Sequence, residues 1–346
     1  MFRLILVLLV TSAATLAGWS LLDKRIDAAD MASPLHGVTY APWAKDQDPL
    51  ESKSSGVLSF LRTAFSEEAP PAIKPRREQI ERDFALLAGN TKYVRTYRTT
   101  DGGEIMPEIA QRNGLKLVPG AWIYSANEAK LQFGREASQV NAEETRALIR
   151  MANQNPQVIE RVLVGNENIL RWDGQKDLRD PNATSPAQLI REIRQVKRNV
   201  KVPVSTAEPW HVWLHYPELV REVDYLAVHI LPYWDEKSDE APLDYVKSRI
   251  GMLREAFPNK NIIVTEIGWP SNGASRRSPA TGLVKQASPA EQAKNIRDAV
   301  AWLGTQNISF FVVEAFDQPW KSYDLEGKAG GYWGLWNADR QQKFAW

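Results

Sequence analysis

The chain of 346 residues contains no cysteine. A disulfide framework, a cysteine nucleophile and a thiolate metal site are therefore excluded. Histidine is also scarce, with four residues, and no Gly-x-Ser-x-Gly motif of a serine hydrolase occurs. His211 and His215 have the i, i+4 spacing of a helical zinc pair, but the glutamate of His-Glu-x-x-His and an obvious third ligand are missing. We expect neither a metal nor another cofactor.

An excess of charge of either sign is missing as well. The 43 Lys and Arg residues nearly balance 42 Asp and Glu residues, which leaves a formal net charge of +1. A nucleic-acid partner needs a basic excess or stripe to neutralise phosphates, so this partner class is not expected. The 43% hydrophobic and 25% charged residues are typical of a globular protein and exclude a disordered or polytopic membrane chain.

One hydrophobic run stands at the N-terminus, over residues 4–22, and Asp23-Lys24-Arg25 follow it. Its length lies between the core of a signal peptide and a membrane-spanning helix. We interpret residues 1–30 as a signal peptide or an uncleaved signal anchor. The rest of the chain is then expected to be exported, to a periplasm or the outer face of a membrane, with membrane association through residues 4–22.

Aromatic residues are plentiful, with 13 Trp, 10 Tyr and 10 Phe. Tryptophan rings stack on sugar rings, and they also fill protein cores. The composition alone leaves a carbohydrate ligand and a tightly packed aromatic core equally open.

Residues 33–346 alternate between short apolar runs and longer segments of helical period. The predicted strands are Gly37–Ala41, Tyr93–Tyr97, Lys116–Ala121, Arg161–Gly165, Val202–Thr206, Tyr225–His229, Asn261–Glu266 and Ser309–Ala315. The predicted helices are Arg77–Ala88, Glu104–Asn113, Asn141–Asn153, Pro186–Arg198, Tyr216–Glu222, Leu243–Ala256 and Pro289–Gly304.

Eight continuous apolar strands separated by helices indicate an α/β fold, a (β/α)8 TIM barrel. We expect one domain over residues 33–346, with an insert at about 45–75, and a tail over Asp317–Trp346 that forms a loop. An open doubly wound sheet is the alternative. It usually carries a glycine-rich phosphate turn after its first strand, and Tyr40-Ala41-Pro42-Trp43 does not resemble one.

Two glutamates lie at the carboxyl ends of predicted strands: Glu167 follows the fourth strand and Glu266 ends the seventh. These two strands are on opposite sides of the predicted barrel. Chemistry in such barrels takes place at the carboxyl ends of the strands. Glycoside hydrolysis needs one carboxyl group to protonate the leaving oxygen and a second to attack or to activate water. The pair therefore predicts glycoside chemistry, although each glutamate alone is equally compatible with an ion pair at the rim.

Several stretches resemble glycoside hydrolase family 17, a family of retaining barrels that act on β-1,3-glucan as glucanases or transglycosylases. The similarity covers roughly residues 35–346 and includes its bacterial, membrane-associated branch. The motifs are Gly165-Asn166-Glu167, Thr265-Glu266-Ile267-Gly268-Trp269-Pro270, Gly37–Pro42, Val94–Tyr97, Val228–Trp234, Glu314–Lys321 and Gly331–Trp336.

The resemblance implies that Glu167 is the acid/base, Glu266 the nucleophile and Asn166 a partner of the sugar 2-hydroxyl. It places Tyr40, Arg95 and Tyr97 at the floor of the site, where Arg95 keeps Glu266 ionised. The remaining residues expected to bind substrate lie after strands six, seven and eight: His229, Tyr233, Trp234, Trp269, Glu314, Asp317, Trp320, Lys321 and Trp336.

Three functions follow as hypotheses. The first is a retaining hydrolase of β-1,3-glucan, and the second is a β-1,3-glucan transglycosylase that branches, elongates or cyclises its substrate. The third is a non-catalytic glucan-binding subunit of a membrane glucan synthase system, although a binding protein has no need of the glutamate pair.

Overall fold

The computed structural model describes residues 35–47, 74–100, 102–173, 183–235, 238–278, 281–323 and 327–346. The expected leader at 1–30 and most of the expected insert at 45–75 lie outside these residues. In the described part of the chain, no helix is both long and apolar enough to cross a membrane.

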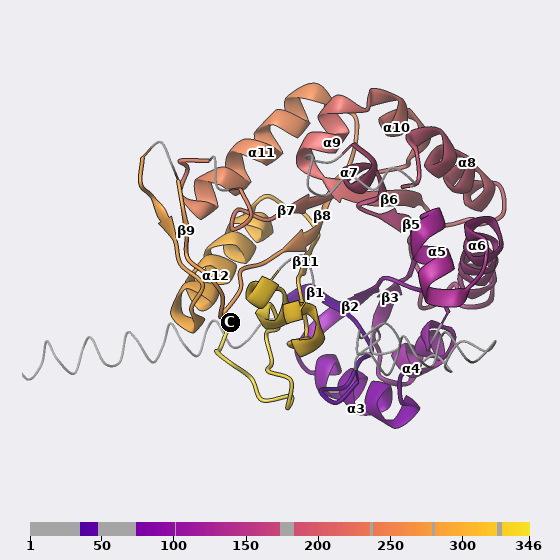
Figure 1. Cartoon of the computed structure of the whole chain (residues 1–346), viewed down its shortest axis with the longest axis horizontal. Coiled ribbons are helices and arrows are strands. Elements are labelled where there is room, and N and C mark those ends of the chain that lie inside the picture. Colours follow the sequence, from indigo (N-terminus) through magenta and orange to yellow (C-terminus); the bar gives the residue numbers. More distant parts are fainter. Residues whose placement is uncertain are drawn as a thin grey trace, which may run out of the picture.

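The centre of the molecule is one sheet whose strands are all parallel, and Figure 1 looks along the ring that they form. The order of its strands is β3-β2-β1-β11-β8-β7-β6-β5-β4. The strands are β1 Leu35–Tyr40, β2 Thr91–Thr96, β3 Lys116–Val118, β4 Gly120–Ala121, β5 Val162–Asn166, β6 Val204–Pro209, β7 Leu226–Ile230, β8 Ile262–Ile267 and β11 Phe310–Val312.

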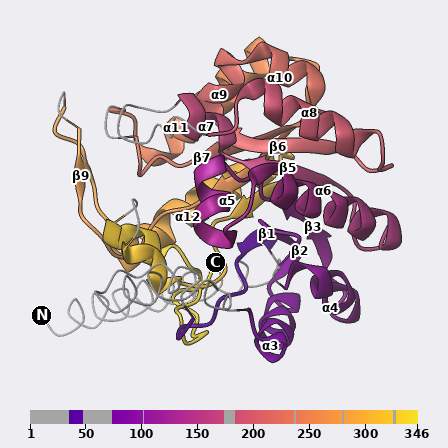
Figure 2. The same ribbon diagram turned by 45° about the vertical axis from the view of Figure 1, so that its right-hand side comes forward.

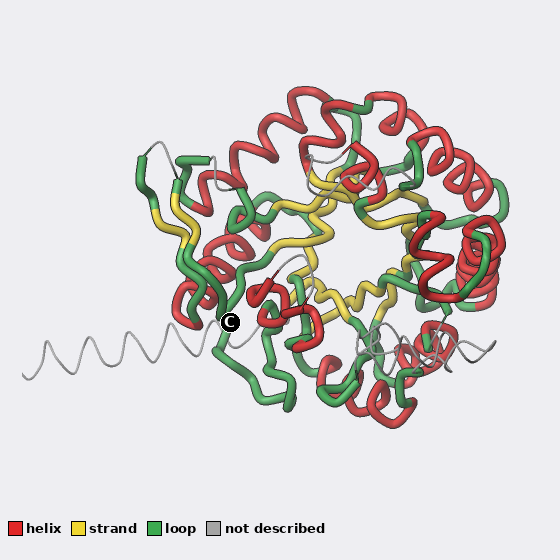
Figure 3. The backbone as a smooth tube through the Cα atoms, viewed as in Figure 1, coloured by secondary structure: helices red, strands yellow, loops and turns green. Residues whose placement is uncertain are grey.

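The predicted third strand is split into β3 and β4 at Pro119, because proline has no N–H to donate to the ladder. β3 pairs with β2, and β4 pairs with β5. The Pro119 carbonyl accepts a 3.0 Å hydrogen bond from Leu163 N, which continues the contact with β5 across the break. The two halves thus fill one strand position, and the ring in Figure 3 closes as the eight-stranded barrel predicted from the sequence.

Helices surround the ring on its outside (Figures 1 and 3). The helix α8 shows why: Leu189, Ile193 and Val196 recur at helical spacing, and all three are buried. All seven predicted helices are present, with these bounds: α3 Arg77–Ala88, α4 Met106–Arg112, α6 Ala137–Gln154, α8 Pro186–Lys197, α10 Pro217–Glu222, α11 Pro242–Ala256 and α12 Pro289–Thr305.

Before the tail, the described residues contain three helices and one hairpin that were not predicted. The short helices lie in the segments that follow the carboxyl ends of β4, β5 and β6, and the hairpin follows β8. They are α5 Ala126–Phe133, α7 Asn168–Asp173, α9 Trp210–His215 and the antiparallel pair β9 Arg276–Arg277 and β10 Val284–Lys285. Figures 1 and 2 show the hairpin projecting beyond the ring of helices.

The core has two layers, because successive residues of a strand face opposite sides of the sheet. The larger layer lies between strands and helices and includes Val38, Val94, Val164, Val228 and Val264, each fully buried. The smaller layer fills the interior of the barrel with Val118, Leu163, Ala207, Tyr225, Ala227, Ile263 and Phe311.

The segment after β11 is not the plain loop expected from its sequence. It contains two 3-10 helices, η3 Pro319–Tyr323 and η4 Gly327–Tyr332. Trp336 then pairs with Phe316 in an isolated bridge and is buried, while Phe344 and Trp346 pack against the outer core layer. The end of the chain therefore covers the barrel wall with aromatic side chains.

Candidate active site

The turn after β5 sets the direction of Glu167. Gly165 has φ +84° and Glu167 has φ +54°, so the chain passes twice through the left-handed region. A Cβ atom on residue 165 would collide with the side chain of Asn168, which explains the glycine. Asn168 in turn donates to the carbonyl of Ile123 at 2.7 Å and accepts from Asn166 N at 3.0 Å. These bonds fix the backbone on both sides of Glu167.

Glu266 stands in β8, and its side chain is 9% exposed. Its Oε1 accepts hydrogen bonds from Nη1 of Arg95 at 2.7 Å and from the hydroxyl of Tyr97 at 2.9 Å. Arg95 also donates to the carbonyl of Thr265 at 2.9 Å and to Oδ1 of Asn166 at 2.5 Å. One buried guanidinium thus joins the ends of β2, β5 and β8.

The surroundings of Glu266 lower its pKa. Burial alone raises the pKa of this carboxyl, but the electrostatic effects of His229 and Arg95 and the hydrogen bonds from Arg95 and Tyr97 outweigh burial. Glu266 is therefore ionised near neutral pH.

His229, at the end of β7, lies between the two glutamates. Its Nδ1 is 2.8 Å from Oε1 of Glu167, and its Nε2 is 3.5 Å from Oε1 of Glu266. The two glutamates place carboxylate oxygens within 4.8 Å of each other. Glu167 is the more exposed, at 26%, whereas His229 is 1% exposed. The pair therefore has one buried, ionised carboxylate and one that is accessible to solvent.

A second ion pair lies beside the first. Both oxygens of the buried Glu314 accept hydrogen bonds from Nζ of Lys321, at 3.0 and 2.9 Å. Burial raises the pKa of Glu314, and Lys321 opposes this rise. Asp317, in contrast, turns toward the tail: its Oδ1 accepts from Gly334 N at 2.9 Å and from Nζ of Lys343 at 2.6 Å.

The expected aromatic residues after β7 and β8 form one cluster, in which Tyr233 is packed edge-to-face against Trp234, Trp269 and Trp333. Trp269 is 1% exposed and donates its indole N–H to the carbonyl of Gln286. Trp234 is half-buried, is stacked on Trp333 with 5.6 Å between ring centroids, and lies beneath the guanidinium of Arg276. Of the expected stacking residues in this cluster, Trp234 alone keeps a partly exposed ring.

Three further expected site residues contact groups other than the two glutamates. Tyr40 points out through the barrel wall, where its hydroxyl donates to Asp83 of α3 at 3.0 Å. Trp336 is a core residue, 1% exposed. Trp320 is half-buried at the edge of η3 and donates to Gln318 at 2.8 Å. The structure thus gives Tyr40 and Trp336 packing positions instead of positions in the site.

Two neighbours of the site were missed. Glu208 ends β6 with its side chain fully buried next to the Glu167 turn, and Trp333 is buried in the aromatic cluster with an unpartnered indole N–H. Trp333 belongs to the Gly331–Trp336 motif, which could have identified it, but Trp336 was the residue of that motif expected to bind substrate. The position of Glu208 at a strand end was its only signal.

In the described residues, one group of three acidic or histidine side chains brings possible metal ligands within 4.8 Å of one another, namely Glu167, His229 and Glu266. The guanidinium of Arg95 lies 2.7 Å from the Glu266 oxygen and would repel a cation there. The arrangement fits a pair of acid–base groups better than a metal centre.

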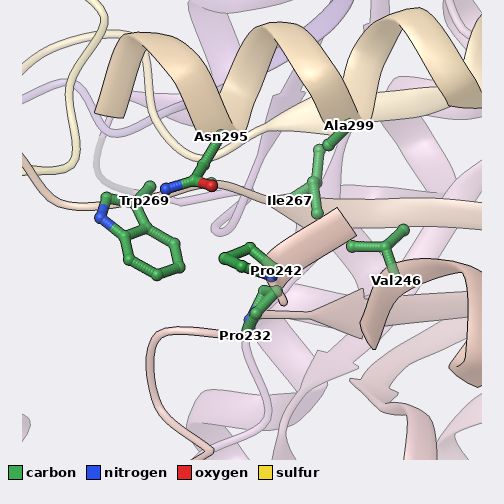
Figure 4. A pocket seen from close by; sticks show the side chains of 8 residues that line it. Pro232, Pro242, Val246, Ile267, Trp269, Asn295 and Ala299 are labelled. Atoms are coloured by element: carbon green, nitrogen blue, oxygen red, sulfur yellow. The ribbon is translucent and has the colours of Figure 1, made fainter. Parts of the chain in front are cut away.

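A small gap lies outside the barrel wall, between the end of β8 and the helices α11 and α12 (Figure 4). Ile267, Trp269, Pro242, Val246 and Ala299 line it, and its volume of about 10 Å³ holds one water molecule at most. This gap is a packing feature separate from the glutamate pair.

Comparison with known proteins places the chain among glycoside hydrolases. Residues 64–334 match the BtgE/BtgC glycoside hydrolase domain. The chain is 26% identical over 282 residues to a glucan 1,3-beta-glucosidase of Arthroderma benhamiae, a match that covers 76% of this chain and 82% of that protein. It is 30% identical over 266 residues to a probable beta-glucosidase, btgE, of Aspergillus flavus, but this match covers 75% of the chain and only 39% of the relative.

Solved structures agree on the fold. A glycoside hydrolase family 17 β-1,3-glucanosyltransferase from Rhizomucor miehei aligns with a TM-score of 0.64 at 22% identity, covering 89% of this chain and 95% of that one. An endo-laminarinase from Formosa aligns with a TM-score of 0.63 at 21% identity, covering 88% and 84%. The resemblance to family 17 is confirmed, and the match over residues 64–334 shows that the chain belongs to the BtgE/BtgC glycoside hydrolase family and is a glycosidase.

Proposed function

We propose that the protein is a retaining glycosidase of β-1,3-glucan, with Glu266 as nucleophile and Glu167 as acid/base. The separation of the two carboxylates carries this proposal. One oxygen of Glu167 and one of Glu266 lie within 4.8 Å of each other, which suits the 5–5.5 Å between carboxyl groups that is typical of retaining enzymes. Inverting enzymes need about 6.5–9.5 Å to hold a water molecule between the sugar and the base.

The surroundings of each glutamate suit its role. Arg95 and Tyr97 keep Glu266 ionised, as attack on the anomeric carbon requires. Glu167, which is more accessible, donates its proton to the glycosidic oxygen as that bond breaks and Glu266 forms an ester with the sugar. Glu167 then takes a proton from water, whose oxygen attacks the anomeric carbon and releases Glu266. Arg95 holds the Oδ1 of Asn166, and we assign the NH₂ group of Asn166 to the 2-hydroxyl of the sugar.

The substrate class is supported by the relatives. The Arthroderma protein is named a glucan 1,3-beta-glucosidase, and an active-site mutant of the Rhizomucor enzyme was solved with laminaritriose. Glu314, Lys321 and Trp234 lie near the glutamates or in the adjoining aromatic cluster, and we assign them to the binding of glucose units. Export, with membrane association through residues 4–22, stays a prediction.

The test is a product time course with a reduced linear β-1,3-glucan oligosaccharide, read by mass spectrometry. Products that are all shorter than the donor identify hydrolysis. The anomer that is released first, assigned by NMR, distinguishes retention from inversion. Glu266→Gln and Glu167→Gln are expected to lower kcat/KM on this donor by about 10³-fold while binding persists in calorimetry. Substantial turnover by Glu266→Gln would contradict the assignment.

Transfer to a second sugar is the other candidate reaction, and the fold shared with a β-1,3-glucanosyltransferase favours it. The same glycosyl-enzyme then reacts with a sugar hydroxyl in place of water. In the same time course, products longer than the donor or cyclic products would identify the transferase.

A further inference from the structure

The residues that directly follow Glu167 are held by a buried carboxyl group from another strand. Oε1 of Glu208 accepts a hydrogen bond from Ile169 N at 3.0 Å, and Oε2 accepts one from Leu170 N at 3.3 Å. These N–H groups belong to the first turn of α7, which has no preceding carbonyls to bond them. Glu208 is completely buried and takes the place of those carbonyls.

The same strand also holds the backbone of Glu167 itself, because Glu167 N donates to the carbonyl of Ala207 at 2.8 Å. Ala207 and Glu208 thus bind three N–H groups, that of Glu167 itself and those of Ile169 and Leu170 in the turn that follows it. A non-glycine residue with φ +54° is strained and persists when its neighbours fix it. The end of β6 supplies this fixation.

The charged groups that face Glu208 are Glu167 and Arg171, whose guanidinium lies 4.8 Å from the ring centroid of Trp122. Burial raises the pKa of Glu208 to about 8, the hydrogen bond from Ile169 N opposes this rise, and the charge of Glu167 adds to it. What the geometry shows Glu208 to contribute to Glu167 is position, through its two hydrogen bonds to the start of α7.

We propose that Glu208 is a positioning residue for the acid/base Glu167: it anchors the start of α7 and so holds the proton donor against the leaving oxygen. The inference rests on the proposed function. Glu208 does not reach the substrate, and its effect is confined to the step in which Glu167 transfers a proton.

The leaving group of the donor separates this role from a general loss of structure. A 2,4-dinitrophenyl β-laminaribioside releases 2,4-dinitrophenolate, which needs no protonation, whereas the sugar that leaves a reduced β-1,3-glucan oligosaccharide needs it. Glu208→Gln places an NH₂ group against one of the α7 N–H donors and releases the turn. We expect kcat/KM to fall roughly 10- to 100-fold on the oligosaccharide and by less than about threefold on the activated donor.

Glu144→Gln is the matched control. Glu144 is also completely buried and accepts two backbone N–H groups, from Thr99 at 2.8 Å and Thr100 at 3.3 Å, but it does not contact the Glu167 turn. We expect Glu144→Gln to change both donors by the same factor. Glu208→Asp, which keeps the carboxyl group but shortens its reach, should repeat the selective loss if the glutamine variant does not fold.

An equal loss on both donors in the Glu208 variants, or no loss on the oligosaccharide, would overturn the positioning role while leaving the proposed function intact. A wild-type protein that cleaves neither donor would remove the proposed function and the inference with it. Selective loss on the oligosaccharide alone supports both.

Discussion

Arg95 is one of the side chains, with His229 and Tyr97, that favour the ionised form of the proposed nucleophile. Its guanidinium lowers the pKa of Glu266, which must be ionised to attack. Activity is therefore lost as the pH falls through this pKa. In Arg95→Met the pKa rises, so the acidic limb of the kcat/KM profile should move to higher pH, by about one unit or more. A pH profile with an activated aryl laminaribioside measures the shift.

Tyr97→Phe is the comparison for this experiment. It removes a neutral hydrogen-bond donor from the same oxygen, at 2.9 Å, and leaves the guanidinium in place. We expect a shift in the same direction but smaller, because a neutral donor stabilises the anion less than a charged one does. An acidic limb that stays where it is in Arg95→Met would show that Arg95 does not control Glu266.

At the level of residues, the sequence predicted the part of the site that depends on strand ends. Glu167, Glu266 and Arg95 come together because parallel strands bring their carboxyl ends to one rim. Tyr40 illustrates the limit. Successive residues of a strand face opposite sides of the sheet. Tyr40 therefore faces the helices outside the barrel, where it contacts Asp83, and not the barrel interior. Which side a given residue faces depends on how its strand pairs with the neighbouring strands, and a local sequence pattern does not show this pairing.

Among the elements, α5 offers a test of local helix signals. Ser125 accepts a hydrogen bond from Glu128 N, and the Glu128 side chain accepts one from Ser125 N, which together form a capping box. Ser125→Ala removes one acceptor, and we expect the free energy of unfolding to fall by about 1 kcal/mol. Urea denaturation followed by circular dichroism measures this change.

Ser185→Ala provides the control, because Ser185 and Gln188 form the same box at the start of α8, on the outside of the barrel. We expect both variants to lose similar stability. A loss for Ser185→Ala with none for Ser125→Ala would mean that packing, and not the cap, determines where α5 begins.

The predicted elements were those with long patterns. Helices of 12 to 18 residues such as α3, α6 and α8 repeat their apolar positions over several turns. The missed helix α5 has eight residues, and its capping residues and Gly134, in the left-handed conformation at its end, were readable signals. The first turn of α7 is bonded by Glu208, 39 residues further along the chain, so no local signal existed for it.

For the whole molecule, the alternation of strands and helices over residues 33–346 was sufficient to predict the barrel. The tail was not predictable in the same way, because 3-10 turns and single aromatic contacts have no period. Its last residues nevertheless bind the first part of the barrel. Arg340 donates to both oxygens of Asp83, at 2.9 and 2.8 Å, and Asp83 also accepts from Tyr40 next to the core.

This contact between the tail and α3 predicts a large effect from a residue far from the glutamates. Asp83 is completely buried, so Arg340→Leu leaves a buried carboxylate without its cation and should lower the free energy of unfolding by about 3–5 kcal/mol. Adding Asp83→Asn removes the charge but keeps an acceptor for Tyr40, so the double variant should recover most of the loss. Urea unfolding of both variants measures it. An Arg340→Leu protein within about 1 kcal/mol of the wild type would mean that the tail does not stabilise the barrel through this ion pair.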